Sequence, residues 1–149
     1  MTVNDELPDI FKSVSTEGSS FELEQKAMDI IADMSKKYVQ WATNDVVRLK
    51  QLFEQIQNLT SSEQDALIRG DFYRIAHDIK GQGATFDYPL LTELGAHICS
   101  LIKTTDVFDE RYLAVFEQDI ADMMQVLEKQ LQADGGQIGE RISNRLKNG

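Results

Sequence analysis

Residues 72–91, FYRIAHDIKGQGATFDYPLL, decide the fold of this chain of 149 residues. The apolar residues of this stretch and just before it recur three, four or seven positions apart, which places them on one face of an α-helix. They are Ile68, Phe72, Ile75, Ile79 and Phe86. Asp87-Tyr88-Pro89 then predicts a turn, because the residue before a proline avoids helical angles and proline suits a first helical turn. The stretch therefore predicts a helix, a tight turn and a second helix.

Similar apolar stripes run through the rest of the chain. They predict helices over residues 22–35, 38–56, 90–102 and 109–132, and a short terminal helix over 137–147. Neither Gly nor Pro occurs between Phe21 and Thr60. Forty residues is nevertheless long for one helix of a compact domain, so we expect two helices there rather than one. In the first of these, Leu23, Ala27, Ile30, Ile31 and Met34 are expected to face inward.

Polar residues mark the boundaries of the central helix. Ser61 and Gln64 have the spacing of a capping box. Gly70-Asp71 predicts an early interruption of this helix, with Asp71 as a new N-cap. Farther along, Gly135-Gly136 is expected to end the helix over 109–132.

The pattern predicts an all-α fold, because the sequence has no sustained period-2 alternation of apolar and polar residues. Each amphipathic helix must bury its stripe, and an antiparallel four-helix bundle with accessory N-terminal and C-terminal helices does so most simply. We expect a flexible N-terminal arm at residues 1–20, the bundle at 21–134 and a C-terminal tail with a short helix at 135–149.

Composition narrows the classes of function. The formal charge of −10 disfavours binding to nucleic acid or to anionic membranes. Cys99 is the only cysteine, so an internal disulfide or a multi-cysteine zinc site is excluded. The acidic start MTVNDELPD and the short apolar runs disfavour a secretory signal or a membrane span, so we expect a cytoplasmic protein. The acid-rich segment 103–134 is interpreted as a solvated face, and the 38–56 stripe with Trp41 as core or a dimer surface.

His77 is the residue whose position calls for a functional explanation. It lies two residues from Ile75 and from Ile79, about 200° around the helix from each, so it is expected to point to solvent. Lys80 and Gly81 follow on the same face. A glycine inside a helix costs about 1 kcal/mol relative to alanine. At Gly81 this cost is explained if a partner needs room to reach the imidazole.

An exposed imidazole beside a cation suits nucleophilic chemistry. Histidine can carry a phosphoryl group on a ring nitrogen, and Lys80 would neutralise part of its charge. Residues 69–80 carry a net charge of +1 in an otherwise acidic chain, which favours an acidic partner. The sequence has no glycine-rich phosphate loop, so we expect no kinase activity of its own.

The run Ile75-Ala76-His77-Asp78-Ile79-Lys80-Gly81-Gln82-Gly83 resembles the motif of histidine-containing phosphotransfer (HPt) domains. The flanking segment 86–90 looks like the version found in alphaproteobacterial stand-alone members. About 30 residues carry the resemblance. It implies a four-helix bundle in which His77 accepts phosphate from the aspartate of one receiver domain and passes it to another. Many members have glycine where this chain has Asp87, a departure expected to affect the helix hairpin or the docking surface.

By this resemblance His77 is the phosphoacceptor, Lys80 stabilises charge and Gly81 provides clearance. The expected partners are the receiver domains of response regulators and a hybrid sensor histidine kinase, and we expect the receiver to supply Mg²⁺, so that this chain needs no cofactor. The protein is expected to be a monomer. Residues near the motif are candidates for docking: Tyr73, Arg74, Asp78, Ala84 and Phe86. Gln82 and His97 are candidates for supporting His77.

Two other interpretations compete with phosphotransfer. A di-iron bundle would need Glu three residues before each histidine, but Arg74 and Leu94 stand there, so we expect no metal site. His97 is interpreted as a boundary residue of its helix, with a hydrogen bond near His77 as the lesser alternative. The runner-up function is a helical interaction module that is not phosphorylated, either a decayed relay domain or a dimerising adaptor.

Overall fold

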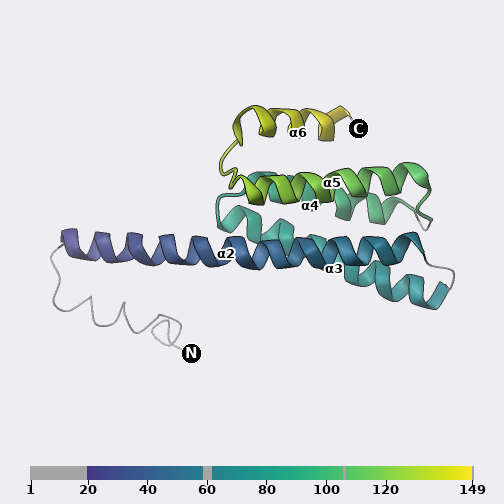
Figure 1. Ribbon diagram of the computed structural model, residues 1–149, viewed down its shortest axis with the longest axis horizontal. Coiled ribbons are helices and arrows are strands. Elements are labelled where there is room, and N and C mark those ends of the chain that lie inside the picture. The colour runs from purple at the N-terminus through teal and green to yellow at the C-terminus, as the bar shows by residue number, and fades with distance from the viewer. Residues whose placement is uncertain (1–19, 59–61, 106, 149) are drawn as a thin grey trace. The chain divides into compact units, whose positions relative to one another are not determined.

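The structure, a computed structural model, describes residues 20–58, 62–105 and 107–148 (Figure 1). These ranges are all-α and contain no strand, which confirms the predicted fold class. The helices are α2 Ser20–Gln57, α3 Ser62–Thr85, α4 Pro89–Thr104, α5 Glu110–Glu128 and α6 Gly136–Asn148. None of the described helices is long and apolar enough to cross a membrane. The predicted arm, apart from Ser20, and the Ser61 cap lie outside the described residues.

The chain divides into two compact units, Met1–Lys37 and Tyr38–Gly149, and the boundary falls within α2. The prediction of two helices over 22–56 was wrong, because α2 is one continuous helix. The physical reason is in the sequence: the segment has no proline or glycine to break the backbone hydrogen bonds. Length alone is a poor argument for a break.

Several apolar residues of α2 are not in a core. In the first unit, Ile31 is 64% exposed and Met34 is 45% exposed, so their expected inward orientation was wrong. In the second unit, Trp41 is 52% exposed, whereas Tyr38 and Leu49 are fully buried. The spacing identified the helix, but it did not determine which apolar side chains would be covered.

The core of the second unit is apolar and rich in aromatic rings. Within it, α4 packs against α3, α5 and α6. Phe72 of α3 makes an edge-to-face contact with Phe116 of α5, with ring centroids 5.3 Å apart. The Tyr38 ring stacks on Phe86 at 4.3 Å. Helix α3 runs through Gly70 without interruption, so the predicted break and the Asp71 cap were wrong.

A tight turn joins α3 to α4 around Asp87, whose φ is +63°. This left-handed conformation favours glycine, and Asp is among the few other residues that tolerate it. The amide of Tyr88 donates to the carbonyl of Gly83 at 2.8 Å and closes the end of α3. Pro89 begins α4, as the sequence predicted. Asp87 thus keeps the helical hairpin at a position where glycine would be less strained.

Helix α5 begins at Glu110 and ends at Glu128, before the predicted end near Gly135. The Asp109 side chain caps it by accepting hydrogen bonds from two backbone amides. After a loop, α6 occupies the place of the predicted terminal helix.

A buried ionic cluster contradicts the interpretation of 103–134 as a solvated face. Asp119 is 0% exposed and Asp122 is 2% exposed, and both face Arg145 of α6 at 2.8 and 2.7 Å. Arg141 adds a second contact to Asp122 at 3.2 Å. Buried carboxylates need such partners, because an unpaired charge away from water is costly. The cluster therefore fixes α6 against α5.

Candidate functional site

His77 stands on the exposed side of α3. Its sequence neighbours Ile75 and Ile79 are 6% and 1% exposed, so they anchor the opposite side of the helix in the core. His77 itself is exposed. The imidazole is therefore presented to solvent from a helix whose rotation is fixed by buried side chains, as the spacing predicted.

An aromatic ring lies next to His77, and a lysine of the neighbouring helix lies against that ring. The half-buried Tyr73 ring, one turn earlier on α3, stacks with the imidazole at a centroid distance of 6.0 Å and an interplanar angle of 26°. The Lys103 ammonium of α4 lies 5.3 Å from the centroid of the Tyr73 ring. A hydrogen bond with the Tyr73 side chain raises the pKa of Lys103, so this lysine stays charged. Lys103 thus adds a positive charge to the histidine face from a second helix.

Lys80 and Gly81 occupy the next turn of α3, and both are exposed. A Cβ atom built on Gly81 would meet no atom within 4 Å in the described part of the chain. The space expected above this glycine is therefore present. The Lys80 backbone is held by α4, since the Thr92 hydroxyl donates to its carbonyl at 2.8 Å. The backbone is anchored while the lysine side chain remains on the open face.

Gly83 differs from Gly81 although it is only two residues away. A Cβ atom there would lie 2.7 Å from Thr92 Oγ1 and 2.9 Å from the Tyr88 carbonyl oxygen. Gly95 of α4 is equally close to α3, with a Cβ atom 2.8 Å from the Ala76 carbonyl oxygen. These two glycines allow α3 and α4 to approach closely, whereas Gly81 has no such packing role.

The other predicted docking residues, and Gln82, which was predicted to support His77, lie on α3 or directly after it. Arg74 is exposed and forms an ion pair with Asp71 at 3.4 Å. Asp78 is exposed, and its charge adds to burial in raising the pKa of Asp45 on α2. Gln82 and Ala84 are also exposed. Phe86 is half-buried against the Tyr38 ring.

His97, the second histidine, is bound elsewhere. Its Nδ1 lies 2.7 Å from Oδ2 of the buried Asp119 on α5, and its side chain is 17% exposed. This agrees with its interpretation as a boundary residue. The structure places His97 in the ionic cluster of α5 and α6, where it does not serve as a hydrogen-bond partner of His77.

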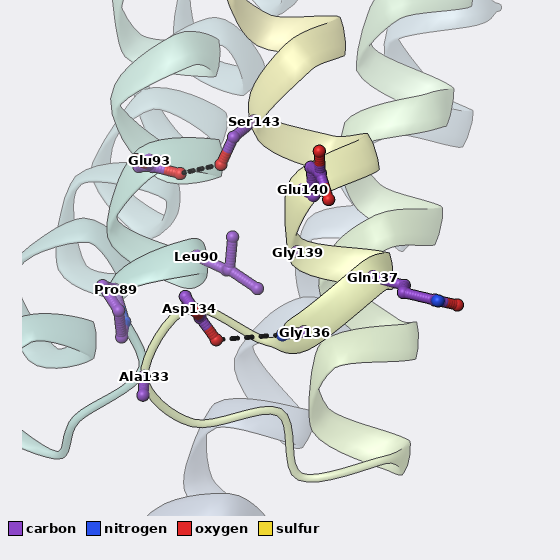
Figure 2. A pocket seen from close by; sticks show the side chains of 10 residues that line it. All are labelled: Pro89, Leu90, Glu93, Ala133, Asp134, Gly136, Gln137, Gly139, Glu140 and Ser143. Carbon is purple, nitrogen blue, oxygen red and sulfur yellow. Dashed lines mark hydrogen bonds between the residues drawn. The ribbon is translucent and has the colours of Figure 1, made fainter.

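Figure 2 shows a pocket that is lined by the start of α4, by the loop between α5 and α6, and by α6 itself. Its volume is about 600 Å³. Ser143 donates to Glu93 at 3.2 Å, and the Gly136 amide donates to Asp134 at 3.0 Å. None of the predicted site residues lines this pocket. Across residues 20–58, 62–105 and 107–148, no group of three or more acidic, His or Cys side chains is arranged to hold a metal ion.

Sequence reasoning missed Lys103, because its contact with Tyr73 depends on how α4 lies against α3. Comparison of the chain with protein-family models, with curated proteins and with solved structures gave no match.

Proposed function

We propose that this protein is a phosphocarrier of the HPt type, in which His77 receives a phosphoryl group from the aspartate of one receiver domain and delivers it to another. The observation that carries the proposal is the exposed imidazole of His77 beside Lys80, with open space above Gly81. In this proposal, residues 38–57 of α2 form an antiparallel four-helix bundle with α3, α4 and α5, and α6 is the accessory helix.

The proposed step is a displacement at phosphorus. The lone pair of His77 Nε2 attacks the phosphorus of an acyl phosphate, and an N–P bond forms as the P–O bond breaks. The aspartate carboxylate of the receiver leaves with the electrons of that bond. The receiver contributes this aspartate and Mg²⁺, so the chain described here needs no nucleotide site. The reverse step, onto a second receiver, regenerates neutral His77.

Charge around His77 favours the phosphorylated state. A phosphoryl group adds about −1.5 to −2 charges at neutral pH. Lys80 on the same helix and Lys103 from α4 lie on this side of the molecule, and both lower the pKa of the Cys99 thiol, against the larger effect of burial. Two ammonium groups near the ring offset the repulsion that the incoming group would meet in a protein of charge −10.

The same exposed face has side chains that a partner domain could contact. Tyr73 and Ala84 provide apolar contact, while Arg74 and Asp78 provide charges that discriminate among partners. A receiver domain presents its phosphorylated aspartate within an acidic pocket, which complements the cations of this face. Such a carrier works in the cytoplasm, and a hybrid sensor histidine kinase supplies the phosphate through its own receiver.

The proposal is tested by incubating the full chain with a receiver domain that carries a radioactive acyl phosphate. We expect an acid-labile, alkali-stable label on the wild type and none on His77→Gln. His97→Gln is the matched control, because it removes the other imidazole, and it should keep the label. Equal labelling of wild type and His77→Gln would refute the assignment.

Lys80→Ala separates charge stabilisation from folding. We expect transfer to slow by about tenfold or more, because one cation beside the phosphoryl group is lost, while the helical circular-dichroism signal is unchanged.

Wild-type protein that binds receivers but never becomes labelled would favour the alternative of a non-phosphorylated interaction module.

A further inference from the structure

The first unit of the chain presents an apolar surface on α2 that the phosphotransfer proposal does not use. Its largest apolar side chains are strongly exposed: Phe21 74%, Met28 63%, Ile31 64% and Met34 45%. At 100° per residue, these side chains and the half-buried Leu23, Ala27 and Ile30 cover about half of the helix circumference. An amphipathic helix with such a face is typical of a segment that binds another protein surface. We call residues 20–37 of α2 the amphipathic segment.

Charged residues along one edge of the amphipathic segment indicate the partner. Glu22, Lys26, Asp33 and Lys37 follow one another at intervals of four, seven and four residues. Those intervals keep all four within about 60° on the helix, next to the apolar face at Ile30. The charges run negative, positive, negative, positive along the segment, and in the reverse direction they run positive, negative, positive, negative. When two such segments are antiparallel, each acid of these four is therefore opposite a base. This edge is therefore complementary to itself when two helices run in opposite directions.

We propose that the partner of this surface is a second copy of the chain, bound through an antiparallel pair of amphipathic segments. Like edges of two helices face each other only when the helices are antiparallel, which is the two-fold arrangement of an isologous dimer. The axis then passes between Asp29 and Ile30. Glu22 faces Lys37 of the second copy, and Lys26 faces Asp33 of the second copy.

The same axis brings the apolar residues together. Ile30 comes beside Ile30 of the second copy, and Met34 lies near Ala27 of the second copy, with Ile31 at the border of the interface. Removing exposed apolar side chains such as Ile31 and Met34 from water supplies the driving force. The ion pair between Lys37 and Asp33 within one chain, at 3.2 Å, is itself exposed. An ion pair exposed to water contributes little to stability, so this pair does not prevent the charges from joining a network across the dimer.

Sedimentation equilibrium of the full chain, at about 1 to 300 µM, tests the proposal. We expect the mass to rise with concentration from 16.9 kDa toward twice that value. Ile31→Asp should abolish the rise. Val107→Asp is the matched control, because Val107 is an exposed aliphatic residue, 73% exposed, outside this segment, and it should leave the dimer intact. A wild-type mass that stays monomeric, or a dimer unaffected by Ile31→Asp, would overturn the proposal.

A charge swap tests the antiparallel direction. Lys26→Glu should weaken the dimer by about tenfold, since two like-charge pairs are created. The double variant with Asp33→Lys as well should restore it, because both pairs between the two copies, 26 with 33 and 22 with 37, are then opposite in charge again. Failure of the double variant to recover would rule out this register. An Ile30→Cys variant adds a direct check, because a disulfide between two copies at position 30 requires the two segments to cross there. The readout is mass, so the result is independent of whether His77 carries phosphate.

Discussion

Two glycines of α3 allow a sharp test of how the site is built, because the same one-carbon change should have opposite effects on them. Gly81→Ala and Gly83→Ala each add a methyl group to a helix interior, where alanine is favoured over glycine by about 1 kcal/mol. At Gly81 the new Cβ meets nothing within 4 Å in the described residues. The whole gain should therefore appear, and Gly81→Ala should raise the free energy of unfolding by about 1 kcal/mol.

At Gly83 the new Cβ would meet Thr92 Oγ1 at 2.7 Å, the Tyr88 carbonyl oxygen at 2.9 Å and the Thr92 amide nitrogen at 3.0 Å. Two of these atoms belong to the backbone. The hydroxyl is held as well, by its hydrogen bond to the Lys80 carbonyl. Overpacking of this kind costs about 1–3 kcal/mol. After the helical preference is subtracted, Gly83→Ala should lower the free energy of unfolding by up to about 2 kcal/mol.

Urea unfolding followed by circular dichroism measures both values. For a chain of this size, each kcal/mol corresponds to a shift of about 2–4 °C in Tm, so thermal melts should move in opposite directions. Gly70→Ala is the matched control, since a Cβ there also meets nothing within 4 Å in the described part of the chain, and it should be stabilising. Equal stability of the Gly81 and Gly83 variants would refute the close approach of α3 and α4. Gly81→Leu should then keep the fold and slow phosphotransfer, whereas Gly70→Leu should not slow it.

Three further substitutions test the packing of the second unit. Burial raises the pKa of Tyr38 from 10.0 to about 12, so stability present below pH 10 should be lost as the pH rises to 12, by about 2–3 kcal/mol. Tyr38→Phe should abolish this alkaline loss in pH-dependent urea titrations, and an unchanged loss would contradict the assignment to Tyr38. At pH 7 the same substitution should stabilise the protein by about 1 kcal/mol, because the buried hydroxyl has no partner among the described residues. Asp87→Gly should add roughly 0.5–1 kcal/mol in urea unfolding, since φ is +63° there, and a loss would show that the carboxylate is needed. Arg145→Met should lower the free energy of unfolding by about 2–4 kcal/mol, because it leaves Asp119 and Asp122 buried without this partner. The loss is smaller than for a fully buried partner, since Arg145 is 25% exposed. An unchanged free energy of unfolding would show that the ionic cluster does not anchor α6.

Local physics explains what could be predicted from the residues. Apolar spacing placed the helices, and Pro89 marked the start of α4. The same spacing put His77 opposite Ile75 and Ile79, because a helix fixes the angle between residues two apart whatever it packs against. The exposed imidazole was therefore accessible to sequence reasoning.

Position in space explains what could not be predicted. Asp119 and Asp122 lie on a helix rich in acids, and their burial is tolerable because Arg145 and Arg141 of α6 and His97 of α4 lie against them. Lys103 reaches Tyr73 because α4 packs on α3. Neither contact leaves a periodic signal, since the partners are many residues apart.

The amino-acid sequence by itself determined which parts of this protein are helical and the side of α3 on which His77 stands, although not that α2 is one continuous helix. The tertiary structure decided that Gly83 is a packing contact and Gly81 an open one, and that Trp41 stays exposed while Tyr38 is buried. The reason is that a helix sets the direction of a side chain from local hydrogen bonds, whereas burial depends on which other helix comes to lie against it.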